Sequence, residues 1–344
     1  MSATRATTFT RRMPPLAARC VMGVAMTGVF GPVIRGLDML GWAPGALAAA
    51  SARMRKKGAA KNPFRTYSPT SHDVFVAAYV KSGTNWMMQI AHQLAFHGQA
   101  EYEHIHSVVP WPDVTLSGPL RHYAIPVEDP SVWMASPEQK RVIKTHFDWD
   151  QLPYSEKARY IIVIRDPKDV FVSSYYFFVK DGPLSFTRFS VDTWYKVFLS
   201  KSLGPWSSWS TNTAGYWAQR HRPNVLIVSF KSMKRDLRGT VRRVADFMDV
   251  RVSDQVIERV CEKASFDYMK RIDDKFRAWQ FIPWGSPAAP MMRKGTEGTS
   301  SELLSLERQR LLDEHFMAEL DRLGADFPYQ EFCDVSPGLT ARAV

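Results

Sequence analysis

The stretch Tyr79-Val80-Lys81-Ser82-Gly83-Thr84-Asn85-Trp86 decides how the rest of this chain is organised. An apolar run from Val74 to Tyr79 leads into it and has the length and composition of a buried strand. Apolar residues then recur at helical spacing, at Met87, Ile90 and Leu94. The stretch is therefore predicted to be a tight turn between a strand and the N-terminus of a helix.

Such a turn is suited to holding a phosphate group, because free backbone N–H groups and the positive end of the helix dipole face it. Lys81 adds a cation, Ser82 and Thr84 add hydroxyl groups, and Trp86 suggests a nucleotide base as a neighbour. The stretch is not a Walker A loop, since the lysine comes first and Gly83 follows two positions later. An ordinary strand-to-helix turn remains the alternative from local chemistry alone.

Length and composition indicate one large α/β domain or two smaller ones. The chain has 344 residues, of which 45% are hydrophobic and 12% aromatic, so it can bury a full core and is not globally disordered. Cys20, Cys261 and Cys333 show neither CxxC nor metal-like spacing. We therefore expect a reducing compartment, no disulfide framework and no metal site.

The net charge of +11 is concentrated near the N-terminus. Residues 1–72 contain eleven Lys or Arg residues and one acid, Asp38, which gives +10 and leaves +1 for residues 73–344. The body of the protein therefore lacks the basic excess of a nucleic-acid-binding domain, and no nucleic-acid partner is predicted.

Residues 1–60 form a basic and apolar extension. Its uncharged runs, Cys20–Ile34 and Met39–Ala52, are fifteen and fourteen residues long and are separated by Arg35 and Asp38. Each run is shorter than the about 20 residues that a membrane span needs. Three interpretations remain: helices lying on a membrane surface with basic residues against anionic headgroups, a secretory or organellar targeting peptide, or helices packed on the protein's own body.

Strands and helices alternate along the rest of the chain. After the first strand and helix, further strands are predicted at Arg141–Thr145, Tyr160–Ile164 and Val225–Val228. Helices are predicted after Asp166 or Pro167, within 194–217, over 237–248, around 256–260 and over 304–320. The Pro-rich stretch 104–137 is typical of a lid or binding wall. We therefore predict a single α/β domain over residues 70–335, with a central parallel β-sheet flanked by helices and ligands at the carboxyl ends of its strands.

Cationic or proton-transferring groups recur at four predicted crossover points: Lys81, His146, Arg165 and the pair Arg293-Lys294. A lone histidine is more often structural and a lone arginine is usually solvated, but four such groups in one predicted region favour a shared site. A polyphosphate ligand with one general base is the simplest explanation.

These residues resemble the motifs of the cytosolic-type sulfotransferases that use 3′-phosphoadenosine 5′-phosphosulfate (PAPS). Tyr79–Trp86 is similar to the family's 5′-phosphosulfate loop, YPKSGTTW, and Arg165–Ser173, RDPKDVFVS, is similar to its 3′-phosphate signature. Met292–Gly298, MRKGTEG, resembles its late RKGxxG loop. The resemblance runs from about Val74 to Phe332, and three motifs in the family's order make it highly specific.

The resemblance implies a role for each matching residue. Lys81 and Lys144 would stabilise the leaving phosphate and the transferring sulfuryl group, and His146 would remove the proton of the acceptor hydroxyl. The remaining implied contacts are with the nucleotide: Ser82, Gly83, Thr84 and Asn85 at the 5′-phosphate, Trp86 and Phe230 at the adenine, and Arg165, Ser173, Arg293, Lys294 and Gly295 at the 3′-phosphate.

The implied chemistry needs PAPS as co-substrate, gives adenosine 3′,5′-bisphosphate (PAP) as product, and requires no metal. Lysines and a helix N-terminus can stabilise the charge on the peripheral oxygens of an in-line transfer. No acidic motif that would hold Mg²⁺ stands beside the loop, which argues against a P-loop kinase.

The chain also departs from the family's pattern. Val80 replaces the loop's usual proline, Phe230 stands where a tyrosine is common, and Ala264 stands where a threonine often contacts the adenine. Thr299-Ser300-Ser301 replaces Asp-Trp-Lys and removes one phosphate partner. The family's dimer motif falls on Ser301–Arg310 and lacks both charged ends, so the oligomeric state is not predicted.

The acceptor is the least defined part of the prediction. Trp111, Phe147, Tyr176 and Trp284 are the expected contacts, and such an aromatic pocket suits a phenol, a steroid, a lipid or another small amphipathic molecule. We predict a cytoplasmic PAPS-dependent sulfotransferase that acts on a hydroxyl group or an amine, with peripheral membrane contact through residues 1–60 as one interpretation of the extension. The alternative is a non-catalytic nucleotide-binding or membrane scaffold protein on the same fold, suggested by the changed loop after Gly298.

Overall fold

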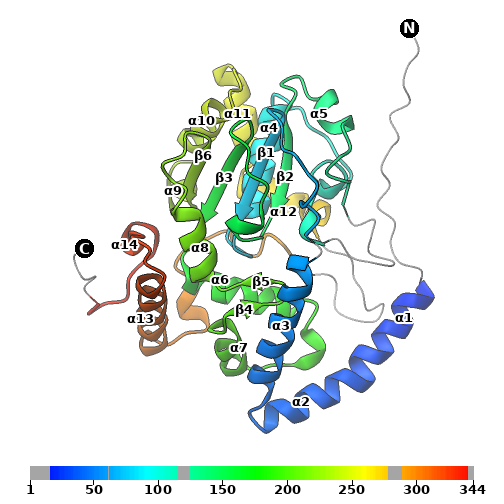
Figure 1. Cartoon of the computed structure of the whole chain (residues 1–344), viewed down its shortest axis with the longest axis vertical. Coiled ribbons are helices and arrows are strands. Elements are labelled where there is room, and N and C mark those ends of the chain that lie inside the picture. Colours follow the sequence, from blue (N-terminus) through cyan, green and yellow to red (C-terminus); the bar gives the residue numbers. More distant parts are fainter. Residues whose placement is uncertain (1–15, 61, 115–123, 278–288, 340–344) are drawn as a thin grey trace.

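A computed structural model describes residues 16–60, 62–114, 124–277 and 289–339, and one parallel sheet lies at its centre (Figure 1). The strands β1 (Asp73–Ala78), β2 (Arg141–Thr145), β3 (Arg159–Ile164) and β6 (Val225–Ser229) lie in the order β2-β1-β3-β6. Every neighbouring pair is parallel. The predicted α/β class with a central parallel sheet flanked by helices is confirmed.

The register brings the carboxyl ends of the strands to one edge of the sheet. Near that edge Ala77 pairs with Thr145, Ala78 with Val163, and Ile164 with Ser229. The segments that follow β1, β2 and β3 therefore begin side by side, although they are far apart in the sequence.

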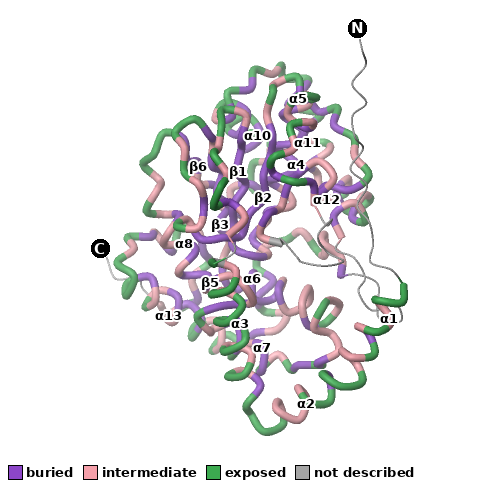
Figure 2. Tube along the Cα trace, turned by 45° about the vertical axis from the view of Figure 1, so that its right-hand side comes forward, coloured by how far each residue is buried: buried purple, intermediate pink, exposed green. Residues whose placement is uncertain are grey.

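Both faces of the sheet are buried, as the continuous apolar strands require (Figure 2). Alternate side chains of β1 point to opposite faces, so Val74 and Val76 pack on one side while Phe75 and Ala77 pack on the other. The first face is covered by α4 (Thr84–Ala95), α10 (Leu237–Phe247) and α11 (Asp254–Lys263). The second is covered by α6 (Pro167–Ser174), α7 (Val191–Phe198), α8 (Trp209–Trp217) and α13 (Leu306–Arg322).

Shorter elements complete the domain. The stretch 194–217 is only partly helical, because Gly204 (φ 62°) makes the turn of a small antiparallel hairpin between α7 and α8. The last helix starts later than predicted, since Ser305 caps it and Leu304 lies outside it. The remaining elements are α5 (Ser131–Ala135), α9 (Phe230–Arg235), α12 (Phe266–Arg271), α14 (Tyr329–Phe332), β4 (Ser202–Leu203), β5 (Trp206–Ser207), the 3₁₀ helices η2 (Ile105–Ser107), η3 (Pro112–Val114), η5 (Trp149–Gln151), η7 (Ser185–Thr187), η8 (Asp273–Phe276) and η9 (Thr299–Glu302), and the π-helix η6 (Tyr175–Lys180).

The N-terminal extension begins with a helix that includes both charged residues between the two apolar runs. The segments α1 (Leu16–Val24), the π-helical η1 (Ala25–Phe30) and α2 (Gly31–Met39) form one helix of 24 residues. Asp38 is accommodated within it because its carboxylate accepts a hydrogen bond from Thr193 Oγ1 at 2.7 Å. By length and composition this helix could cross a membrane, and only 11% of its most apolar 18-residue stretch is buried.

A second helix, α3 (Ala43–Ala60), follows a turn at Gly41 (φ 73°) and packs against α7 and β4 (Figure 1). Arg55 on α3 forms an ion pair with the buried Asp148 at 2.9 Å, and Ser51 Oγ accepts a hydrogen bond from the backbone N–H of Gly204 at 3.0 Å. These contacts fix α3 to the domain.

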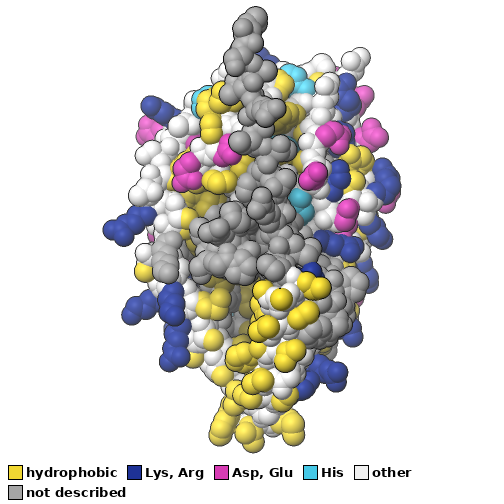
Figure 3. All heavy atoms as spheres, turned by 90° about the vertical axis from the view of Figure 1, so that its right-hand side faces the viewer, with side chains coloured by type: hydrophobic (Ala, Val, Ile, Leu, Met, Phe, Trp, Pro, Cys, Tyr) yellow, Lys and Arg dark blue, Asp and Glu magenta, His cyan; other side chains and the backbone are white. Residues whose placement is uncertain are grey.

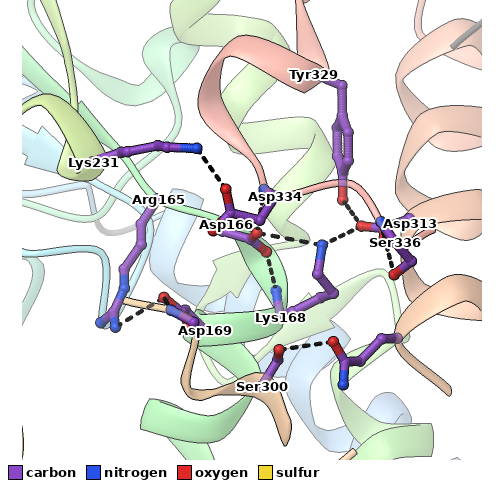
Figure 4. Close-up of polar contacts among 12 residues, drawn as sticks. Arg165, Asp166, Lys168, Asp169, Lys231, Ser300, Asp313, Tyr329, Asp334 and Ser336 are labelled. Atoms are coloured by element: carbon purple, nitrogen blue, oxygen red, sulfur yellow. Dashed lines mark hydrogen bonds and ion pairs between the residues drawn. The ribbon is translucent and has the colours of Figure 1, made fainter. Parts of the chain in front are cut away.

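A buried polar network ties the C-terminal segment to α6 (Figure 4). Lys168 Nζ contacts Asp313 on α13 and lies 3.3 Å from Asp166. Asp313 also accepts hydrogen bonds from Tyr329 Oη at 2.8 Å and from the backbone N–H of Ser336 at 2.9 Å. Burial opposes the charge of Lys168, but Asp166 and Asp313 outweigh it and raise its pKa. Lys168 belongs to the RDPKDVFVS motif, and its ammonium group serves this network.

Asp313→Asn should lower the free energy of unfolding by about 3 kcal/mol, because it leaves the ammonium group of Lys168 buried with only the more distant Asp166 as a counter-ion. Urea denaturation measures the loss. The matched control is Asp192→Asn, which removes the exposed partner of Arg308 and should change little. Equal effects of the two substitutions would contradict a stabilising role for the network.

Candidate active site

The turn after β1 is shaped by two residues with positive φ, Lys81 (65°) and Gly83 (102°). A Cβ atom on Gly83 would lie 2.7 Å from Phe230 Cδ2, so only glycine fits there. The Trp86 N–H donates to the carbonyl oxygen of Gly83 at 3.0 Å, so the N–H groups of Thr84 and Asn85 are those that α4 leaves without a helical partner. The hydroxyl oxygens of Ser82 and Thr84 are buried without a hydrogen-bond partner. A bound phosphate would satisfy the two N–H groups and the Thr84 hydroxyl.

The turn opens into a cavity of about 370 Å³ at the carboxyl ends of the strands. This cavity brings together side chains from all the segments singled out in the sequence. Its predicted lining residues are Lys81, Gly83, Thr84, Asn85, Trp86, Trp111, Lys144, His146, Arg165, Ser173, Phe230, Arg293, Lys294 and Gly295. Ser82 is fully buried behind the turn and does not line the cavity.

Two lysine ammonium groups lie in this cavity without an ion-pair partner among the described carboxylates. Lys81 Nζ is 3.8 Å from the ring centroid of Phe177, and Lys144 Nζ is 3.5 Å from that of Trp111. Burial, together with the charge of the nearby Arg165, lowers the pKa of Lys81 to about 7. Burial likewise lowers the pKa of Lys144 to about 7, against the opposing effect of Asp113. An anionic ligand would supply the missing counter-charge and favour the protonated lysines.

His146 is oriented to act as a base. Its Nδ1 lies 2.7 Å from the carbonyl oxygen of Ala78. A carbonyl can only accept, so Nδ1 carries the proton and Nε2 keeps its lone pair. Burial and the charge of Lys144 hold the pKa of His146 well below its usual value, which keeps the ring neutral. The rings of Trp111 and Trp206 stand edge-on to it, each with a centroid separation of 5.6 Å.

Arg165 connects the turn after β1 with the late loop. Its Nη1 donates to the carbonyl oxygen of Lys81 at 3.2 Å and its Nη2 to that of Thr296 at 3.4 Å. The guanidinium lies 4.3 Å from the ring centroid of Phe230, while Asp169 forms the nearest ion pair at 3.5 Å. Its Nε is buried without a hydrogen-bond partner, so the guanidinium group of Arg165 retains one free N–H donor.

The late loop is held against α6 by Asp169. This carboxylate accepts hydrogen bonds from the backbone N–H groups of Gly298 at 3.2 Å and Thr299 at 2.8 Å, and from Thr299 Oγ1 at 3.0 Å. Thr299, one of the residues that depart from the family's pattern, therefore anchors the loop. Gly295 (φ 64°) is required by close packing, since a Cβ there would lie 2.1 Å from Phe266 Cδ2.

The two cations of the late loop share one carboxylate. Arg293 binds Glu302 through Nη1 at 2.7 Å and Nη2 at 3.3 Å, and Lys294 Nζ lies 3.0 Å from the same group. The guanidinium of Arg293 also stacks 4.4 Å from the ring centroid of Tyr176. Both cations are thus already partnered, unlike Lys81 and Lys144.

Part of the cavity wall, next to Trp86 and Phe230, is apolar. Trp86 Nε1 donates to the carbonyl oxygen of Ala264 at 2.7 Å, and its ring meets Phe230 edge-on at 5.5 Å. Met233 and Leu237 also line this end of the cavity. Ala264, where the resemblance suggested a lost polar contact, orients Trp86 through its backbone.

The predicted acceptor residues lie in different places. Trp111 lines the main cavity, whereas Tyr176 lines a small side pocket. Phe147 packs against Phe64 in the core and does not line the cavity, so its position does not agree with the predicted substrate contact. Trp284 lies outside the described residues.

Sequence reasoning missed several residues of the site. Trp206 and Phe178 line the cavity, Glu302 holds the late-loop cations, and Asp113 accepts hydrogen bonds from the backbone N–H of His146 and from Thr145 Oγ1. Burial raises the pKa of Asp113 to about 6. The aromatic composition of 194–217 was visible, but no periodicity indicated that Trp206 faces the site.

Comparison with known proteins identifies the family. A model of the sulfotransferase domain matches residues 71–324. This chain belongs to the sulfotransferase family. Family membership confirms the resemblance on which the sequence prediction rested, and it makes the cavity the candidate active site of a sulfotransferase.

Relatives and structures of the family show how similar the chain is to them. Luciferin sulfotransferase of Photinus pyralis is 32% identical over 60% of this chain and 59% of its own length, so the match spans less than two thirds of that protein. Sulfotransferase 1C2 of Oryctolagus cuniculus is 24% identical over 76% of this chain and 88% of its own.

Two solved structures share the fold. Retinol dehydratase, crystallised with androsterone and PAP, superposes with a TM-score of 0.63 at 20% identity, over 80% of this chain and 88% of its own. Mouse sulfotransferase SULT7A1, complexed with PAP, superposes with a TM-score of 0.57 at 19% identity, over 79% of this chain and 90% of its own.

The free energy of unfolding should rise as the pH increases above about 7. The two buried lysines have a pKa near 7 in the folded state and 10.5 as ordinary side chains, so the unfolded state holds more protons between these values. Urea unfolding at several pH values measures this slope, which is at most about 1.4 kcal/mol per pH unit for each group. The double substitution of Lys81 and Lys144 by Met should flatten it, whereas the exposed control Lys196→Met should not. A slope unchanged in the double variant would contradict the low pKa values.

Proposed function

We propose that this protein transfers a sulfuryl group from PAPS to a hydroxyl group, or an amine, of a small amphipathic acceptor and releases PAP. One observation carries the proposal: two lysines without a carboxylate partner among the described residues and a neutral imidazole with a free Nε2 share a single cavity. Cations alone would suit many anions, but cations beside a correctly oriented base suit group transfer.

The residues of the cavity suit PAPS along its whole length. In this proposal the Thr84 hydroxyl and the first N–H groups of α4 hold the 5′-phosphate, and Trp86 and Phe230 enclose the adenine. Arg165 and Ser173, with Arg293, Lys294 and Gly295 of the late loop, hold the 3′-phosphate. The unpartnered hydroxyl of Thr84 and the free Nε of Arg165 support this placement.

His146 and the two lysines divide the chemistry between them. His146 Nε2 accepts the proton of the acceptor hydroxyl as its oxygen forms the new bond to sulfur. Lys81 stabilises the bridging oxygen, which leaves with the 5′-phosphate when its bond to sulfur breaks. Lys144 neutralises the peripheral oxygens of the sulfuryl group. Asp113 keeps His146 and Lys144 in place through the end of β2.

The walls beside His146 favour an apolar acceptor. Trp111, Trp206 and Phe177 are aromatic and line the cavity near the imidazole. Such a wall suits a phenol, a steroid-like alcohol or a lipid alcohol better than a charged glycan. Retinol dehydratase, which shares this fold, was crystallised in complex with androsterone, and this agrees with the proposal. The acceptor of this chain therefore belongs, in our proposal, to this amphipathic class.

Other elements of the proposal concern the chain as a whole. We assign the catalytic domain to residues 70–335 and a separate extension to residues 1–60, in a cytoplasmic protein with peripheral membrane contact. A non-catalytic scaffold on the same fold is the alternative. The neutral His146 beside two unpaired lysines favours the enzyme, because a scaffold needs no oriented base.

His146→Gln should reduce the rate of sulfate transfer from labelled PAPS by at least about 100-fold, because it removes the proton acceptor. PAP affinity, measured by calorimetry, should stay within about threefold of the parent value, because this side chain is not assigned to the nucleotide. The exposed control His221→Gln should change neither quantity. Unchanged turnover in His146→Gln would overturn the mechanism, and no transfer by the parent protein to any alcohol or amine tested would favour the scaffold.

A further inference from the structure

The helix formed by α1, η1 and α2 turns large apolar side chains to its outward face as well as to its inner one. Gly23 and Gly31 are buried on its inner side, and Ile34 and Leu37 pack against the core of the domain. Its outward positions are large and apolar, and Val21 is 71%, Val29 59% and Val33 57% exposed. A helix that packs only on its own domain turns its large apolar side chains inward. The outward face of this helix therefore lacks a partner within the described chain.

The exposed apolar side chains are concentrated in this helix and the turn after it. Among the described residues, nine of the fifteen exposed large hydrophobic side chains fall between residues 16 and 42. Figure 3 shows them gathered at the lower end of the molecule, and Figure 2 shows the same helix as mostly exposed or intermediate. A contiguous apolar patch of this kind marks a contact surface.

The charge of the same region indicates what covers it. The described residues 16–60 contain six Lys or Arg residues and one acid, Asp38, a net charge of +5, and Arg53, Lys56 and Lys57 on α3 are exposed. A second copy of the chain would bring the same positive charge to the contact and be repelled. A bilayer with anionic headgroups supplies both the apolar interior and the opposite charge.

The helix is also braced against the wall of the active-site cavity. Asp38 accepts a hydrogen bond from Thr193 at 2.7 Å, and a Cβ on Gly31 would lie 3.2 Å from the carbonyl oxygen of Phe186 in η7. The chain between η7 and η6 is held by a hydrogen bond from the Leu184 N–H to the Phe178 carbonyl at 2.7 Å. Phe178 lines the cavity. One segment thus separates the exposed apolar helix from the proposed acceptor site.

We propose that the outward face of α1–η1–α2 lies in the headgroup–acyl boundary of an anionic bilayer, and that the acceptor is a lipid-soluble alcohol that enters from this membrane. The helix lies along the surface and does not cross it, because its inner face stays attached to the domain through Gly31 and Asp38. The acceptor part rests on the proposed function; the membrane contact does not.

The test is sedimentation of the full chain with phosphatidylcholine vesicles, with and without phosphatidylglycerol. The parent protein should bind, and at least about tenfold more tightly when the anionic lipid is present. The triple substitution Val21→Gln, Val29→Gln and Val33→Gln should weaken binding at least about tenfold, since it removes exposed apolar contacts without touching the packed face. The matched control is Met134→Gln, Leu306→Gln and Leu311→Gln, three exposed apolar positions elsewhere, and it should bind like the parent.

Three results would overturn the membrane contact: no binding by the parent, equal loss in the two triple variants, or a discrete dimer without lipid that the helix variant alone disrupts. The acceptor part is tested by sulfate transfer to a long-chain alcohol dissolved in the vesicles and to a water-soluble phenol. The helix variant should lose transfer to the first and keep transfer to the second, and parallel loss or parallel retention would overturn this part. Vesicle binding without transfer to either alcohol by the parent would reject the proposed function and leave the membrane contact standing.

Discussion

The site depends on two lysine ammonium groups, of the buried Lys144 and the half-buried Lys81, that share one cavity and have no ion-pair partner among the described carboxylates. Burying an unpaired charge is costly, so such groups either release their protons or wait for an anion. In this structure burial lowers the pKa of both Lys81 and Lys144 to about 7. Lys81 lies over the ring of Phe177 and Lys144 over the ring of Trp111. These cation–π contacts stabilise the ammonium groups but do not neutralise their charge. The cavity is thus prepared for an anionic ligand.

The rest of the fold keeps that arrangement rigid. The parallel sheet places the ends of β1, β2 and β3 side by side, and the buried Lys168–Asp313 pair holds α6 against the C-terminal segment (Figure 4). Asp169, one residue further along α6, fixes both Arg165 and the late loop. Arg293 and Lys294 are already neutralised by Glu302, whereas Lys81 and Lys144 have no ion-pair partner among the described carboxylates. We infer that Lys81 and Lys144 face the phosphosulfate end of the ligand, where negative charge develops during transfer.

Much of this could be predicted from the sequence because local patterns determine it. The apolar strands, the turn with Gly83 and the order of the motifs are local features, and they led to the fold, the family and the set of residues that line the cavity. Three side chains of the site were missed: Trp206, Asp113 and Glu302. They reach the site through tertiary contacts, which produce no periodic pattern in the sequence. Phe147 was expected at the acceptor, but it packs against Phe64 in the core, a tertiary contact that the local sequence does not indicate. The helix that includes Arg35 and Asp38 was also not visible in the sequence, because Thr193 on α7 offers Asp38 a partner from a distant segment.

The proposed cavity binds a nucleotide that is phosphorylated at both the 5′ and the 3′ position, with Arg165 at the 3′-phosphate. Calorimetric titration of Arg165→Met with PAP and with adenosine 5′-monophosphate tests this assignment. PAP affinity should fall about 100-fold, as expected for the loss of a charge-assisted contact with phosphate, while affinity for the monophosphate should change less than about threefold. Equal losses for the two nucleotides would contradict it.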